Sequence, residues 1–167
     1  MEYTEEIINN LIKEEKVIST PPRREFKLIG MHLRNDFGLT SFDEVRSFHV
    51  FMRRHSEYQE NFSIGLIYLP EDRSSIQLIR FNGNHGEVVD NPLNPHPHRD
   101  FHIHKITPKL IEEENNDLKF VEVTDKYGSF EQAFRYFCKY ITIINAESYF
   151  PELDQPNLFE DSNDTEV

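Results

Sequence analysis

Five of the eight histidines fall within the twenty residues 85–104. In residues 101–104 an apolar side chain alternates with imidazole, giving Phe-His-Ile-His. Successive side chains of an extended strand point to opposite faces, so His102 and His104 are expected on one face. Their rings would then lie about 6 to 7 Å apart, close enough to act on one metal ion or one phosphate.

A second strand is predicted from Ser75 to Phe81, and the loop that follows it is rich in Gly, Pro and Asn. Loops longer than about twelve residues are uncommon unless they are functional or disordered. If the two strands pair antiparallel, the start of this loop lies beside the histidine pair. The expected site therefore has three candidate proton-transfer residues, His85, His102 and His104, and four candidate substrate-binding residues, Arg80, Asn82, Lys105 and Thr107.

Three interpretations of this site stay open. Histidine titrates near neutrality, so one imidazole could accept a proton and another donate one while Arg80 or Lys105 stabilises a pentacovalent phosphate, as cleavage of RNA at a 2'-hydroxyl requires. Alternatively, His85, His102 and His104 could bind zinc or manganese. In the third interpretation the histidines only hydrogen-bond the backbone or form a protein-binding surface.

Other reactive side chains have simpler structural explanations. Cys138 lies on the apolar face of a predicted helix, where a buried and inert thiol is expected. Ser129 is placed to cap that helix. The cluster Arg53-Arg54-His55 fits a solvated strand end, although it could extend a groove.

The surrounding pattern predicts an α+β domain with a mostly antiparallel sheet of about five strands. An N-terminal amphipathic helix and a C-terminal helix are expected to pack on the sheet. Strands are predicted over 25–34, 47–53, 62–69, 75–81, 101–107 and 120–123, and helices over 3–16, 108–114 and 129–140. Asn35 to Gly38 has the composition of a turn. The expected organisation is a helix within residues 1–19, a single domain over 20–146 and an acidic, disordered tail over 147–167.

Charge is distributed unevenly along the chain. The formal net charge is -12, with 18 Lys and Arg against 30 Asp and Glu, and residues 141–167 contain no Lys or Arg. Because affinity for duplex DNA depends on clustered cations, this composition argues against duplex DNA as a partner. The acidic tail instead suits docking onto a basic protein. No apolar run reaches the eighteen or so residues of a membrane span, so a cytoplasmic protein without a membrane partner is expected.

Three motifs resemble a family of small uncharacterised bacterial proteins. Residues 80–86 read Arg-Phe-Asn-Gly-x-His-Gly, residues 100–107 read Asp-Phe-His-Ile-His-x-x-Thr, and residues 123–127 read Val-Thr-Asp-x-Tyr. The similarity covers about residues 60–145. The histidine loop and His-x-His strand are also more loosely similar to toxin components of bacterial toxin–antitoxin pairs. The resemblance implies an α+β fold and the location of the site, and it implies no assigned activity.

Two functions are expected from these observations. The first is a small bacterial or mobile-element protein whose histidine site performs phosphodiester or nucleotide chemistry on RNA. The second is a non-enzymatic binding module or inhibitor that acts through its aromatic and acidic surface and tail. No cofactor follows from the sequence, and zinc or manganese would be needed only in the metal interpretation.

Overall fold

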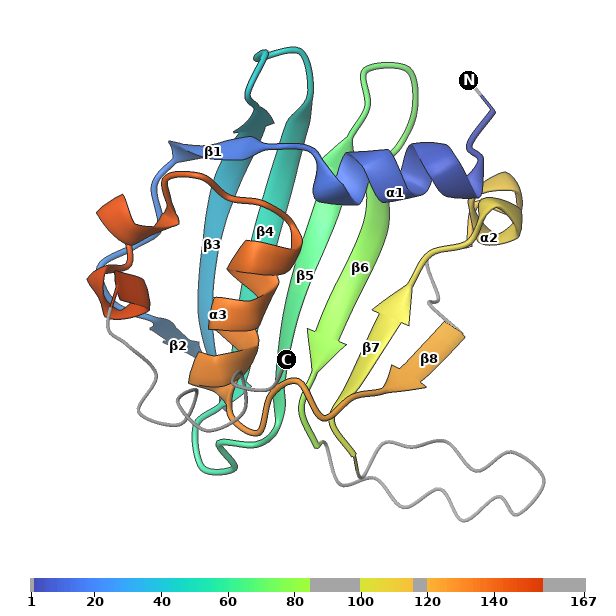
Figure 1. Ribbon diagram of the computed structural model, residues 1–167. Helices are drawn as coiled ribbons and strands as arrows, with labels where there is room; N and C mark the ends of the chain where they lie inside the picture. Colours follow the sequence, from blue (N-terminus) through green and yellow to red (C-terminus); the bar gives the residue numbers. More distant parts are fainter. Residues whose placement is uncertain (1, 85–99, 116–119, 155–167) are drawn as a thin grey trace, which may run out of the picture.

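A computed structural model of the chain describes residues 2–84, 100–115 and 120–154. These residues form an eight-stranded antiparallel sheet in the order β1-β3-β4-β5-β6-β7-β8, with β2 paired to β3 (Figure 1). The strands are β1 (Lys16–Thr20), β2 (Lys27–Ile29), β3 (His32–Ser41), β4 (Ser47–His55), β5 (Phe62–Leu69), β6 (Ile76–Asn82), β7 (His102–Lys105) and β8 (Phe120–Val123).

Both long helices lie on the same face of this sheet, α1 (Glu5–Lys13) across its upper end and α3 (Phe130–Tyr140) along its middle (Figure 1). The short helix α2 (Pro108–Glu112) follows β7, and two 3-10 turns, Ala146–Ser148 and Pro151–Asp154, follow α3. The opposite face of the central strands carries the side chains of the candidate site.

The core lies between the sheet and α3 and is rich in phenylalanine. Phe137 of α3 meets Phe81 of β6 edge to face, with ring centroids 5.2 Å apart, and Phe134 meets Phe37 of β3 in the same way at 6.4 Å. Burying a side chain of this size contributes about 1.5 to 3 kcal/mol. This packing holds α3 over the strands whose other face forms the site.

The helices begin at side-chain caps that the sequence contains in the expected places. Thr4 accepts a hydrogen bond from the backbone N–H of Ile7, and Ser129 accepts one from Gln132, each satisfying a donor that the first helical turn leaves open. Thr107 caps α2 in the same way through the N–H of Leu110.

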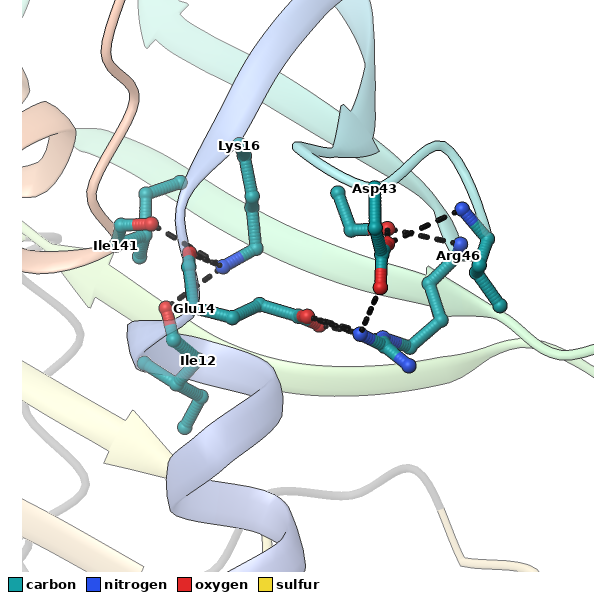
Figure 2. Close-up of polar contacts among 8 residues, drawn as sticks. Ile12, Glu14, Lys16, Asp43, Arg46 and Ile141 are labelled. Carbon is teal, nitrogen blue, oxygen red and sulfur yellow. Dashed lines mark hydrogen bonds and ion pairs between the residues drawn. The ribbon is translucent and has the colours of Figure 1, made fainter.

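Lys16, at the start of β1, is completely buried and ties both long helices to the sheet (Figure 2). Its Nζ donates to the carbonyl oxygens of Ile12 and Glu14 at 2.9 Å and of Ile141 at 3.1 Å. Burial lowers the pKa of Lys16 to about 7, while the charge of Glu14 acts in the opposite direction. Three converging carbonyl acceptors also favour the charged ammonium, because it has three protons to donate.

The α+β class and the antiparallel sheet are confirmed, but the predicted number of about five strands is wrong. The extra strands come from segments at the N-terminal side: Lys16–Thr20 pairs with β3, and Lys27–Ile29 and His32–Ser41 form a hairpin around Gly30, whose φ is +62°. The predicted helix over 3–16 stops at Lys13 and is followed by β1.

The predicted turn at Asn35 to Gly38 is also wrong, because these residues lie in the middle of β3. The side chain of Asn35 exchanges two 3.0 Å hydrogen bonds with the backbone of Arg23, and Asp36 is paired with Arg53. A Cβ on Gly38 would lie 2.9 Å from the side chain of Thr20, so glycine permits the close approach of β1. Long-range contacts therefore override a turn-forming composition.

The first part of the predicted acidic tail, residues 147–154, packs onto the domain. Phe150 is buried, with its ring centroid 4.7 Å from that of Phe134. Arg135 donates to the carbonyl oxygens of Glu152 and Leu153. Residues 155–167 of that prediction lie outside the described residues.

Candidate functional site

His102 and His104 lie on one face of β7, as alternation along a strand requires. Their ring centroids are 4.9 Å apart and the ring planes are inclined by 71°. The two residues are 0% and 3% exposed, so the imidazoles are enclosed and not spread on the surface. The structure thus brings the two histidines into direct contact.

Two hydrogen bonds in the described residues favour one tautomer of His102. Its Nδ1 lies 2.7 Å from the backbone oxygen of Asp100, and its Nε2 lies 3.2 Å from Nδ2 of Asn82. A carbonyl oxygen only accepts, so Nδ1 carries the proton and Nε2 presents a lone pair to the Asn82 amide. A neutral ring with a basic Nε2 and an Nδ1–H oriented by an acceptor is the form that a general base requires.

Tyr127 holds β6 and β7 together beside this pair. Its hydroxyl lies 3.0 Å from the carbonyl oxygen of Asn82 and 2.9 Å from that of His102. The hydroxyl proton is therefore shared by one acceptor on β6 and one on β7. Burial raises the pKa of Tyr127 above its ordinary value, although its bond to the Asn82 backbone lowers it in part, and the hydroxyl keeps its proton. Tyr127 therefore positions Asn82 and His102, whose side chains are hydrogen-bonded to each other.

The strand register places further polar residues in line with the histidine pair, on β6, β5, β4 and β3. Residues directly opposite one another in an antiparallel pair point to the same face. The pairing of β3 to β7 gives one row, Arg34, Arg53, Ser63, Asn82 and His102, and beside it a second row, Asp36, Phe51, Gly65, Arg80 and His104. We call these two rows the polar face. Phe81, which lies between Arg80 and Asn82 on β6, contacts Phe137 of α3, so the polar face is the face turned away from α3.

The described strands place more arginines than carboxylates on the polar face, in a chain that is acidic overall. In the strands β3 to β7, Asp36 is the one carboxylate. It forms an ion pair with Arg53 and lies 3.5 Å from Nε2 of His49. Partial burial alone would raise the pKa of Asp36, but the hydrogen bond and charge of Arg53 lower it below its ordinary value. On the described strands of this face, three arginines (Arg34, Arg53 and Arg80) therefore accompany one carboxylate.

A cavity of about 230 Å³ opens at the β3 side of the polar face. It lies where β3 and β4 meet the beginning of β5. Its lining combines one aromatic ring, that of Phe62, with cationic and neutral polar groups: His32, Arg34, Arg53, Asn61 and Ser63. Such a lining suits an anion, because arginine presents a planar fork of donors to phosphate or carboxylate oxygens.

Not every residue expected from the sequence lies at this site. Lys105 points to the opposite face of β7, because it is one residue beyond His104, and its Nζ donates to Asn9 of α1 at 2.6 Å. Thr107 caps α2, as described above. The structure brings together Arg80, Asn82, His102 and His104 and separates Lys105 and Thr107 from them. His85 lies outside the described residues.

Sequence reasoning missed the β3 side of the polar face. His32 and Arg34 lie in a segment predicted as one strand over 25–34, and Ser63 and Phe51 carry no charged group. The one signal was the cluster Arg53-Arg54-His55, which alternation divides: Arg53 joins the polar face, whereas Arg54 points to the helices and lies 3.1 Å from Glu131. Only the register shows that these residues are neighbours.

The described residues offer no cluster of three or more His, Cys, Asp or Glu side chains that could hold a metal ion. Both ring nitrogens of His102 are also engaged by Asp100 and Asn82. Cys138 is buried in α3, and burial raises the pKa of its thiol, so it keeps its proton. The metal interpretation also includes His85, which lies outside the described residues.

Comparison with known proteins returned no matching family model, no matching curated protein and no matching solved structure. Within the described residues, no helix combines the length and the apolar character needed to cross a membrane.

Proposed function

We propose that the polar face binds RNA or a nucleotide through its phosphate and that His102 and His104 transfer protons at the phosphodiester. The observation that carries this proposal is the His102 ring, whose Nδ1–H points to a backbone carbonyl 2.7 Å away while Nε2 faces Asn82, next to His104 and Arg80. An oriented base, a second imidazole and a guanidinium are the groups that metal-independent RNA cleavage uses.

The proposed reaction is an internal transfer. Nε2 of His102 takes the proton of a 2'-hydroxyl, and that oxygen attacks phosphorus. The bond from phosphorus to the 5'-oxygen breaks, and His104, acting as the acid, gives this oxygen its proton. The products are a 2',3'-cyclic phosphate and a free 5'-hydroxyl, while Arg80 stabilises charge on the non-bridging oxygens.

Because both rings are buried, substrate binding must replace a hydrogen bond that His102 already makes inside the protein. Nε2 of His102 already accepts a hydrogen bond from Asn82. The 2'-hydroxyl must take the place of this amide as the donor, and apo enzymes often tighten such contacts only when substrate is bound. Asn82 would then be released to bond the substrate through its side-chain oxygen, which is buried and has no hydrogen-bond partner among the described residues.

Cleavage of a labelled RNA oligonucleotide tests this proposal. His102→Gln and His104→Gln should each lower the rate by about 100-fold or more, because each removes one proton-transfer group. Lys109→Gln, which removes an exposed charge on α2, should keep the wild-type rate. The products should carry a cyclic phosphate, and a strand with 2'-deoxyribose at the cleaved position should be inert. Wild-type rates in both histidine variants would contradict the proposal.

The same measurement separates the alternative of a non-enzymatic binding module. A folded wild-type protein that binds RNA or a protein partner without cleaving any strand would support that alternative.

A further inference from the structure

The cavity at the β3 side of the polar face is separated from the histidine pair by several strands. Arg53 lies on β4 and His102 on β7, in the same row. Neighbouring strands are about 4.8 Å apart, so the two positions are separated by about 14 Å. One phosphate group cannot contact both places.

Arg34 and Arg53 are directly opposite each other on β3 and β4. Like charges in directly opposed positions destabilise a sheet, so this pair calls for a compensating anion. Asp36 compensates Arg53. The guanidinium of Arg34 is exposed, and it has no ion-pair or hydrogen-bond partner among the described side chains. The cavity therefore contains a cation whose charge the described residues do not balance.

Neutral and cationic groups around Arg34 complete an anion site. Asn61 and Ser63 supply an amide and a hydroxyl donor. The ring of His32 meets the ring of His55 edge to face, with centroids 5.4 Å apart. Nδ1 of His55 accepts hydrogen bonds from the backbone N–H groups of Glu57 and Tyr58, both at 3.1 Å. These bonds fix the orientation of the His55 ring, against which the His32 ring packs.

Phe51 lies on β4 two residues from Arg53, and its ring extends over β5, toward the strands that carry the histidine pair. A Cβ on Gly65 would lie 2.3 Å from two atoms of the Phe51 ring, so the ring rests directly on the glycine of the neighbouring strand. Phe51 is half-buried, although it belongs to the face opposite the core. An aromatic ring laid against a sheet among cations is a platform on which a nucleic-acid base can stack.

We propose that the cavity formed by His32, Arg34, Arg53, Asn61 and Ser63 binds a backbone phosphate of a single-stranded nucleic acid, and that a neighbouring base stacks on Phe51. The preference for a single strand follows because a base inside a duplex is already stacked on both sides. The ligand is then a strand of several nucleotides that extends from the cavity toward His102 and His104. This inference rests on the proposed function for the direction of the strand, but the cavity binds independently of cleavage.

Equilibrium binding of a fluorescent RNA of about twelve nucleotides tests the inference. A DNA strand of the same sequence and the RNA annealed to its complement serve as the two other ligands. Arg34→Gln should weaken RNA binding by about 5- to 10-fold and reduce the slope of log affinity against log salt by about 0.7, the value for one phosphate contact on a single strand. Lys109→Gln should leave the affinity and slope at wild-type values.

Phe51 is tested by two substitutions so that a folding defect is recognised. Phe51→Leu keeps apolar volume and removes the aromatic face, and Phe51→Ala removes both. Both should weaken binding by about 5-fold or more, with thermal unfolding of the leucine variant close to that of the wild type. Equal affinity for the RNA and DNA strands would show that the protein recognises the phosphates and bases that both contain. Tighter binding of RNA would show that the 2'-hydroxyl is also contacted.

The outcomes separate this inference from the proposed function. Wild-type affinity in Arg34→Gln and Phe51→Leu, with cleavage still lost in His104→Gln, would overturn the cavity assignment and leave the proposed function standing. Weaker binding in Arg34→Gln and Phe51→Leu without any cleavage by the wild type would support the cavity and overturn the catalytic proposal. Duplex bound as tightly as the single strand would overturn the inference.

Discussion

The side-chain nitrogen of Asn82 lies 3.2 Å from Nε2 of His102, and this contact joins the last residue of β6 to the first residue of β7. Because the Asp100 carbonyl accepts a hydrogen bond from Nδ1–H, the Asn82 amide is a donor to Nε2 of a neutral imidazole. The chemistry proposed for the site depends on this neutral form.

Asn82→Asp should convert His102 to the doubly protonated imidazolium, because a carboxylate in place of the amide can only accept. Nitrogen NMR of the imidazole should show a proton on both ring nitrogens in the variant and on Nδ1 alone in the wild type at neutral pH. Cleavage by the variant should fall by about 100-fold, since the base has lost its lone pair. A variant that keeps both a neutral ring and full activity would show that Asn82 does not set the state of His102.

Tyr127→Phe removes the hydroxyl that bridges the Asn82 and His102 carbonyls and keeps the ring. We expect the free energy of unfolding to fall by about 1 to 2 kcal/mol. If the bridge positions the base, kcat for RNA should fall while KM changes little, because the phosphate contacts remain. Chemical denaturation and steady-state kinetics measure the two effects separately; a loss of stability with unchanged kcat would assign Tyr127 a structural role only.

Gly83 follows β6 at a point where no side chain fits. A Cβ there would lie 1.9 Å from the backbone oxygen of Glu60 and 2.6 Å from the Phe62 ring, and the Gly83 N–H donates to the Phe62 carbonyl at 3.0 Å. Gly83→Ala should lower the free energy of unfolding by about 2 to 3 kcal/mol. Gly128→Ala is the matched control: its Cβ would meet only the flexible end of Gln132 at 3.4 Å, so a change below about 1 kcal/mol is expected. Similar losses in both variants would refute the steric argument.

Lys16 should make stability depend on pH. Burial lowers its pKa from 10.5 to about 7. Between these values the unfolded chain binds more protons than the folded one, so the free energy of unfolding rises with pH across this window, and below it the full cost of burying the charge applies. Lys16→Met should lose this rise, which amounts to about 1.4 kcal/mol per pH unit at most.

Urea unfolding at about pH 7 and about pH 9 measures the Lys16 effect. The exposed residue Lys109 provides the control, since Lys109→Met should keep the wild-type rise. Identical pH dependence in the wild type and Lys16→Met would show that Lys16 keeps an ordinary pKa through its three carbonyl acceptors.

Local sequence patterns predicted the elements whose partners are close in the chain. The hairpin of β5 and β6 followed from two apolar runs around Pro70, and α3 followed from its phenylalanine spacing and the Ser129 cap. The alternation of residues 101–104 predicts His102 and His104 on one face, which the structure confirms. The ring centroids are 4.9 Å apart, closer than the expected separation of about 6 to 7 Å.

Patterns failed where distant residues decide the structure. β1 forms because Lys16 to Thr20 pairs with β3, twenty residues or so further along, and its buried lysine gave no apolar signal. The polar face could not be predicted from the sequence for the same reason. Arg34, Arg53 and Ser63 are neighbours only because of the register between β3, β4 and β5. Lys105 was grouped with His104 by proximity in sequence, whereas alternation sends it to the other face.

Mapping bound RNA onto the chain by amide NMR tests the central claim most directly. The protein, with His104→Gln to prevent turnover, is titrated with the single-stranded RNA, and the shifted amides are assigned to the two faces of the sheet. The claim predicts shifts gathered on Arg34, Arg53, Ser63, Arg80 and their neighbours, with α1 and α3 unchanged. Shifts confined to α1 and α3 would contradict the claim. So would the absence of any shift at RNA concentrations that saturate binding of the fluorescent RNA.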